Sequence, residues 1–159
     1  MATLLGAAII GTSAPRIITT VGTDIAIRTL TTTTSSIGSL ISYLTTNTKS
    51  GASDINSTLV SLDLEFTISI IENVVKEYDE KELNEPLKKA LLGVHEILEL
   101  IHKELNLIKE AIEYHNSKYF KNWRSFSWSG NTEAIKQHNN TLKSRYSMLL
   151  ELLKIYSKK

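Results

Sequence analysis

The hydrophobic pattern is most regular between Pro86 and His115, where apolar residues recur at alternating steps of four and three. The eight residues of this seam are Leu87, Leu91, Val94, Leu98, Ile101, Leu105, Ile108 and Ile112. Such spacing is typical of a helix that buries one narrow apolar face against partner helices. Lys and Glu residues occupy many of the positions between. Asn84 fits an N-cap and Pro86 fits the first turn, so we predict a helix over 85–116, about 45 Å long.

Two further helices are predicted on either side of this one. The first, over 54–78, follows four-residue steps with a wider apolar face; its residues are Leu59, Leu62, Phe66, Ile70 and Val74, flanked by Ile68, Ile71 and Val75. The second, over 132–157, again alternates four and three, through Ile135, Asn139, Leu142, Tyr146, Leu149, Leu153 and Tyr156. Both faces match the central seam and are expected to pack on it.

The N-terminal third differs from the rest of the chain. Residues 1–50 contain thirteen Thr and six Ser, and their only charged residues are Arg16, Asp24, Arg28 and Lys49. Pro15 can begin a helix. Thr residues lose side-chain freedom in a helix and their hydroxyls compete for the backbone, so we expect a break or bend over 29–36. A short amphipathic stripe follows, formed by Ile37, Leu40, Ile41 and Leu44.

These patterns predict an all-α protein: an antiparallel helical bundle of three long helices plus one or two short N-terminal helices. At 159 residues the chain is expected to form one domain with a sizeable core. We divide it into a low-charge segment over 1–50, packed on the bundle or on a partner, and a bundle core over 51–159.

An aromatic-rich link separates the last two predicted helices. Five aromatic residues fall within ten positions: Tyr119, Phe120, Trp123, Phe126 and Trp128. One interpretation is a hydrophobic plug that closes an end of the bundle. The other is an exposed anchor for a partner or a membrane interface, which the neighbouring basic residues would suit.

The sequence offers little catalytic chemistry. Glu99 and His102 form a Glu-x-x-His pair, the local unit of di-iron bundles, but His138 on the last helix has Ile135 three residues before it rather than a carboxylate, so no second pair is present. The chain lacks cysteine and the common hydrolase and nucleotide-binding motifs. We therefore predict no enzyme, no metal site and no cofactor. A net charge of +1 also disfavours nucleic acid as a partner.

Asn139 occupies a seam position of the last predicted helix. A buried Asn can fix the register of packed helices at some cost in stability. Alternatively, the seam begins at Leu142 and Asn139 faces water. The residue types do not decide between these two interpretations.

No stretch has the roughly 20 mostly apolar residues that a membrane span needs, and the N-terminus fits a secretory signal poorly. We expect an intracellular, cytoplasmic location, with membrane association or a place in a virion as alternatives. The richness in Ile, Asn, Lys and Thr is typical of proteins from AT-rich genomes, including large DNA viruses.

The overall layout resembles that of HeLo-type helical bundles, which occur in fungal cell-death proteins and at the N-terminus of the mixed-lineage kinase-like pseudokinase. The segments that carry this resemblance are LKKALLGVHEILELIHKEL (87–105), FKNWRSFSW (120–128) and NNTLKSRYSMLLELL (139–153). The resemblance implies a self-associating bundle that engages membranes through its N-terminal part. Residues 1–50 depart from it, because they lack the basic cluster that such domains use on anionic lipid.

Taken together, the sequence predicts a non-enzymatic structural or interaction protein that oligomerises or joins a larger assembly, such as a viral particle. A protein partner or self-association is expected, through residues 1–50 and the aromatic link. The alternative is a membrane-associating or membrane-perturbing bundle of the cell-death type.

Overall fold

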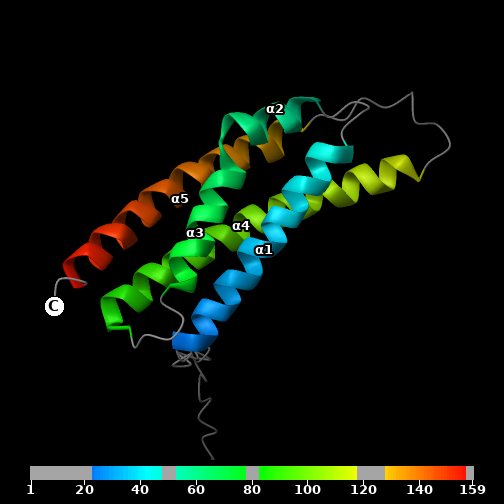
Figure 1. Cartoon of the computed structure of the whole chain (residues 1–159). Coiled ribbons are helices and arrows are strands. Elements are labelled where there is room, and N and C mark those ends of the chain that lie inside the picture. The colour runs from blue at the N-terminus through cyan, green and yellow to red at the C-terminus, as the bar shows by residue number, and fades with distance from the viewer. Residues whose placement is uncertain (1–22, 48–52, 78–82, 118–127, 157–159) are drawn as a thin grey trace, which may run out of the picture.

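The computed structural model describes residues 23–47, 53–77, 83–117 and 128–156 (Figure 1). Nearly all of these residues are helical, as the periodicity predicts. The helices are α1 (Thr23–Asn47), α2 (Ser53–Ser61), α3 (Leu64–Lys76), α4 (Glu85–Asn116) and α5 (Ser129–Tyr156).

Helix α4 is the longest helix and occupies the range expected from its seam. Its N-cap is Asn84, whose side-chain oxygen accepts a hydrogen bond of 3.0 Å from the backbone N–H of Leu87. Pro86 stands in the first turn, where its missing N–H costs nothing. All eight seam residues are buried, and Ile97 is buried with them.

Helix α1 runs without interruption through the threonine-rich stretch, so the break expected over 29–36 is wrong. The hydroxyls of Thr32 and Ser39 donate to carbonyl oxygens one turn back, those of Arg28 and Ser35. They therefore add to the helix rather than compete with it. Packing supplies the remaining stability that Thr lacks intrinsically, because one side of α1 is buried: Ile27, Leu30, Thr33, Thr34, Ile37, Leu40, Ile41 and Leu44.

The helix predicted over 54–78 is divided into α2 and α3. The chain turns at Asp63, whose φ of 51° lies in the left-handed region, which Asp tolerates better than most residues. The turn shifts the phase of the apolar face. Leu64, Ile68, Ile71 and Val75 are buried, whereas Phe66 is 61% exposed and Ile70 is 36% exposed. The predicted stripe through Phe66 and Ile70 is therefore on the wrong side of α3.

Helix α5 begins at Ser129, three residues before the predicted start at 132. Thr132 donates two hydrogen bonds to the carbonyl oxygen of Trp128, one from its backbone N–H at 2.9 Å and one from its hydroxyl at 3.0 Å. These bonds stabilise the first turn of α5. Most of the predicted seam is buried, in the order Ile135, Asn139, Leu142, Leu149 and Leu153. Tyr146 is only partly buried, and Tyr156 lies at the exposed C-terminal end.

Neighbouring helices run in both relative directions. Thr33 and Ser36 of α1 contact Glu99 and His102 of α4, and both pairs are separated by 66 residues. A constant separation means that α1 and α4 run in the same direction, as Figure 1 shows. Helix α5 runs opposite to α4, since Asn131 contacts Glu104 whereas Arg145 contacts Glu96. Helices α4 and α5 thus form an antiparallel pair, whereas α1 lies parallel to α4.

Candidate interaction surfaces

The apolar residues that the sequence singles out in α1 face the protein's own core. Ile37, Leu40, Ile41 and Leu44 are all buried against neighbouring helices. Helix α1 contacts both α3 and α4. These four residues are thus not a free surface, and of the alternatives for the N-terminal third, packing on the bundle applies to the described part of it.

The aromatic link is described only at its end. Tyr119, Phe120, Trp123 and Phe126 lie outside the described residues. Trp128 is 9% exposed and belongs to the hydrophobic core. The Trp128 side chain therefore packs in the interior of the bundle and is not an exposed anchor.

Glu99 and His102, the pair with metal-ligand spacing, are engaged by hydroxyls of α1. The Thr33 hydroxyl donates to Glu99 Oε1 at 2.6 Å, and Ser36 Oγ lies 2.8 Å from His102 Nε2. One turn earlier on the same side of α4, the buried Nδ1 of His95 has no hydrogen-bond partner. Within the described residues, no three His, Asp or Glu side chains come together as a metal site. The pair therefore joins two helices.

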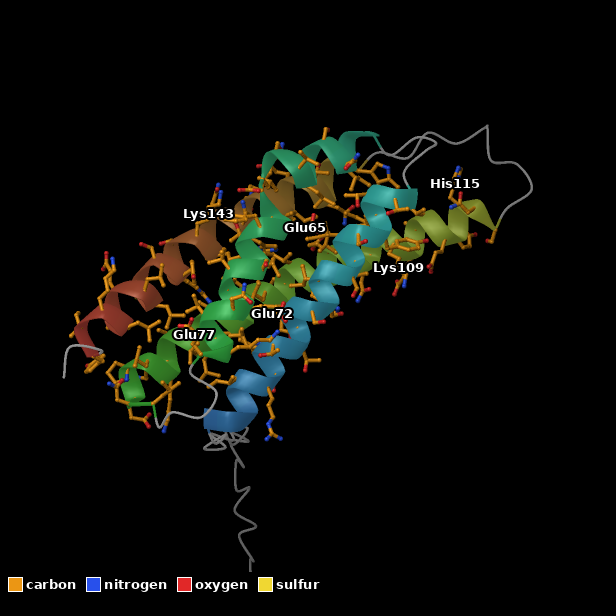
Figure 2. All side chains as sticks on the ribbon, in the orientation of Figure 1. Glu65, Glu72, Glu77, Lys109, His115 and Lys143 are labelled. Carbon is orange, nitrogen blue, oxygen red and sulfur yellow. The ribbon has the colours of Figure 1, made fainter. Side chains whose placement is uncertain are left out.

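Farther along the same interface, a tyrosine and a lysine extend the polar contacts between α1 and α4. Lys109 Nζ lies 5.3 Å from the centre of the Tyr43 ring, a cation–π distance. Partial burial raises the pKa of the Tyr43 hydroxyl, and the nearby Glu113 carboxylate, which is also hydrogen-bonded to it, raises it further. Figure 2 shows Lys109 on α4 near the end of α1.

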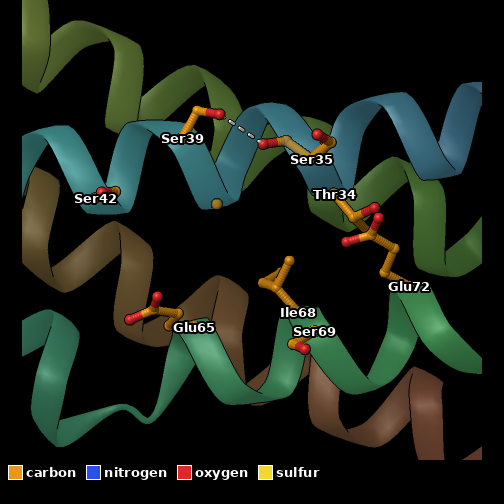
Figure 3. A pocket seen from close by; sticks show the side chains of 9 residues that line it. Thr34, Ser35, Ser39, Ser42, Glu65, Ile68, Ser69 and Glu72 are labelled. Carbon is orange, nitrogen blue, oxygen red and sulfur yellow. Dashed lines mark hydrogen bonds between the residues drawn. The ribbon is translucent and has the colours of Figure 1, made fainter.

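A polar groove lies between α1 and α3 (Figure 3). Serines and Thr34 line the α1 side, and Glu65, Ser69 and Glu72 line the α3 side. A Cβ added at Gly38 would meet nothing within 4 Å, so the groove is open there. Glu72 reaches toward Thr34 in Figure 3 and forms an ion pair of 2.7 Å with Lys76. The groove offers acceptor oxygens but holds no buried polar group without a partner.

Asn139 is fully buried, which favours the first of the two interpretations of this residue. Its Nδ2 donates to the backbone oxygen of Leu62 at 3.4 Å. Leu62 lies in the turn between α2 and α3, where helical hydrogen bonding is interrupted. The second polar atom of the side chain, Oδ1, is buried without a partner. Asn139 thus contacts the α2–α3 junction from α5, and its role in helix register stays a prediction.

The outward side of α4 carries a second, exposed apolar strip. Leu92, Leu100 and Leu107 are each 44% exposed, and Tyr114 is 57% exposed. The last three are seven residues apart and therefore share one face, on the side opposite the buried seam. Charged residues alternate with them, namely Glu96, Glu99, Lys103 and Glu110, and several of these line a shallow groove with Leu100 and Leu107. This strip was not among the predicted features, although its heptad spacing is visible in the sequence.

Other exposed apolar side chains lie on α2, α3 and α5. Val60, Phe66 and Ile70 face outward from α2 and α3, and Met148 and Ile155 face outward from α5. These residues are interspersed with polar ones and do not combine into a described groove. None of the helices in the described ranges is long and apolar enough to cross a membrane.

Comparison with known proteins finds a partial similarity to a viral protein. Over 65 residues, the chain is 42% identical to an uncharacterized protein of Acanthamoeba polyphaga mimivirus. The shared region is 41% of this chain and 30% of the viral protein, so the chain spans less than a third of that relative's length. No protein-family profile matches the sequence, and no solved structure is similar to it.

Proposed function

We propose that this chain is a non-enzymatic structural protein that binds other protein surfaces, including its own, within a larger assembly. The observation that carries the proposal is the second apolar strip on α4. The inner seam of that helix is already filled by α1 and α5. A regular outward strip is therefore not needed to build the core, and it suits a helix-to-helix contact with another molecule.

The similarity to the mimivirus protein supports a viral context for this assembly. It covers part of each chain, and the identity over that part is well above chance resemblance. The amino-acid usage of the whole sequence points in the same direction. In this proposal the protein is a component of a virus particle or of the structures that build one.

The absence of enzymatic activity is part of the proposal and rests on how the polar residues are used. Glu99 and His102, the only pair with a recognisable chemical spacing, form interhelical hydrogen bonds with Thr33 and Ser36. Glu104 accepts from Asn131, and Arg145 contacts Gly93 and Glu96. These groups position helices relative to one another.

Association with a membrane surface is the competing function. Its basis is the resemblance to HeLo-type bundles together with the exposed Phe66 and Ile70, since a membrane interface accepts such side chains. The burial of Ile37, Leu40, Ile41 and Leu44 removes the α1 residues that would have served it.

Sedimentation velocity of the full chain over a wide concentration range tests the first proposal. We expect a species larger than the monomer, with its population rising with concentration. A parallel flotation assay with vesicles of mixed neutral and anionic lipid tests the second. A strictly monomeric chain that floats with the vesicles would replace the first function with the second.

A further inference from the structure

We infer that the outer face of α4 is the self-association surface, and that two copies of this chain pair through it with their α4 helices antiparallel. The inference rests on the proposed function and names the partner and the geometry. The surface is defined by Leu92, Glu96, Leu100, Lys103 and Leu107, and the neighbouring Glu99 is turned toward α1 by its hydrogen bond with Thr33.

Apart from the contact of Glu96 with Arg145, this surface is free of the neighbouring helices. On one side of it, Glu99 and His102 reach α1. On the other side, Glu104 and Gly93 are contacted by Asn131 and Arg145 of α5. The three leucines lie between these two boundaries with the same exposure, 44% each. Nothing else in the described part of the chain covers them.

The charges on the surface select a second copy in an antiparallel orientation. When two α4 helices cross with the symmetry axis between Glu99 and Leu100, Lys103 of each copy faces Glu96 of the other. The same register places Leu107 of each copy against Leu92 of the other. In a parallel pair each charge would instead face its own copy, and like charges directly opposed are unfavourable.

Lys103 and Glu96 are both available for an ion pair with a second copy. Lys103 has no ion-pair partner among the described residues. Glu96 is 70% exposed at its side chain and contacts Arg145 at 3.1 Å, which leaves one carboxylate oxygen for a second cation. A two-fold axis then forms two Glu96–Lys103 pairs at once, as expected for an isologous interface.

The size of the surface sets the expected strength. On each copy, three half-exposed leucines, one glutamate and one lysine amount to less than the roughly 800 Å² per partner that a standard stable interface buries. The dimer should therefore be weak and concentration-dependent, and salt should weaken it because its specificity is electrostatic.

Charge exchange between two full-length variants tests the inference. Lys103→Glu and Glu96→Lys should each weaken self-association by about tenfold or more in sedimentation equilibrium, because each creates like-charge contacts across the axis. An equimolar mixture of the two variants should recover the association of the original chain, since each variant then meets its complement. Lys143→Glu, the same charge change on exposed α5 (Figure 2), is the matched control and should have no effect.

Cysteine cross-linking distinguishes the orientation, and the chain has no native cysteine to interfere. Under mild oxidation Leu100→Cys, near the axis, should form a disulfide-linked dimer. Leu107→Cys should not, because its two copies would lie about 22 Å apart along antiparallel helices. Efficient linking of Leu107→Cys would overturn the antiparallel register.

The outcomes separate this inference from the proposed function. If the original chain oligomerises but both charge variants and their mixture behave like it, the α4 surface is wrong while self-association stands. If the original chain stays monomeric at every concentration, the self-association and the α4 contact are both wrong. Circular dichroism of each variant confirms that a loss of association is not a loss of folding.

Discussion

The side chain of Asn139 donates a hydrogen bond from Nδ2 to the carbonyl oxygen of Leu62, which links α5 to the turn between α2 and α3 across 77 residues of sequence. The bond is long, at 3.4 Å, and the Oδ1 atom of the same side chain is buried without a partner. We propose that the contact specifies where α5 meets the junction more than it adds to stability.

Replacing this residue should separate specificity from stability. Asn139→Ala removes the hydrogen bond and leaves a small cavity, so we expect the free energy of unfolding to fall by about 1–3 kcal/mol. Asn139→Leu fills the space and removes the unpaired oxygen, and should cost less. Urea unfolding measures both, with the exposed neighbour Asn140→Ala as a control that should change little. A larger loss for Leu than for Ala would contradict this account.

Which side of α3 faces the core can be tested directly. Ile68 is 2% exposed and Phe66 is 61% exposed. Ile68→Ala should lower the free energy of unfolding by about 2–4 kcal/mol because it creates a cavity in the core, whereas Phe66→Ala should change it by less than about 0.5 kcal/mol. Chemical denaturation of the two variants side by side is the measurement. Equal losses would mean that Phe66 is also part of the core.

The backbone at Asp63 makes a separate prediction. A left-handed φ is strained for residues with a Cβ and free for Gly. Asp63→Gly should therefore leave stability unchanged or raise it by up to about 1 kcal/mol, while the β-branched Asp63→Val should lower it by more than about 1 kcal/mol. Thermal unfolding followed by circular dichroism can rank the three chains. A stable Val variant would show that the turn between α2 and α3 readily straightens.

The raised pKa of Tyr43 predicts that the stability of the fold depends on pH in the alkaline range. Burial and the Glu113 carboxylate raise its pKa in the folded state above the ordinary value of 10.0. The folded chain then holds this proton more tightly than the unfolded chain does. Its contribution to stability is complete below pH about 10 and is lost as the pH rises through the folded-state pKa.

Tyr43→Phe should flatten the loss of stability above pH about 10, because the side chain can no longer ionise. Tyr146, whose pKa is also raised by burial, should give a similar effect of its own when changed to Phe. Urea unfolding midpoints at neutral and alkaline pH are compared. An unchanged alkaline slope in the Tyr43→Phe variant would show that its hydroxyl is equally ionisable in both states.

Regular packing faces could be predicted from the sequence, and exceptions to them could not. The apolar residues from Leu87 to Ile112 recur over so many turns that only one orientation of the helix about its axis buries all of them. The turn at Asp63 contains neither Gly nor Pro, so its only local signal is an Asp that tolerates a left-handed φ, and this signal is weak. The continuity of α1 depends on contacts with α3 and α4 that override the weak helix propensity of Thr.

The surfaces were harder to predict than the core for a related reason. Helix periodicity shows that a face is apolar, but not which neighbour covers it or in which direction that neighbour runs. From the sequence alone, Ile37 and Leu44 could face a partner, but in the structure they are buried in a core that α1 forms with α3 and α4. Leu100 and Leu107 stand out as a separate strip only because α1 and α5 occupy the two flanks of α4. Whether Asn139 is buried depends on the contact with Leu62, which lies opposite it in the structure.

The constant separation of 66 residues between α1 and α4 also has a kinetic consequence. Because the two helices are parallel, the chain must travel the length of the bundle and return before Thr33 meets Glu99. The α4–α5 contact between Glu104 and Asn131 closes only 27 residues. Closing the longer loop costs more chain entropy, so the α1–α4 contact should form after the α4–α5 contact in folding. Thr33→Val should accordingly speed unfolding and leave the refolding rate nearly unchanged in stopped-flow experiments, because the α1–α4 contact is the one that opens first.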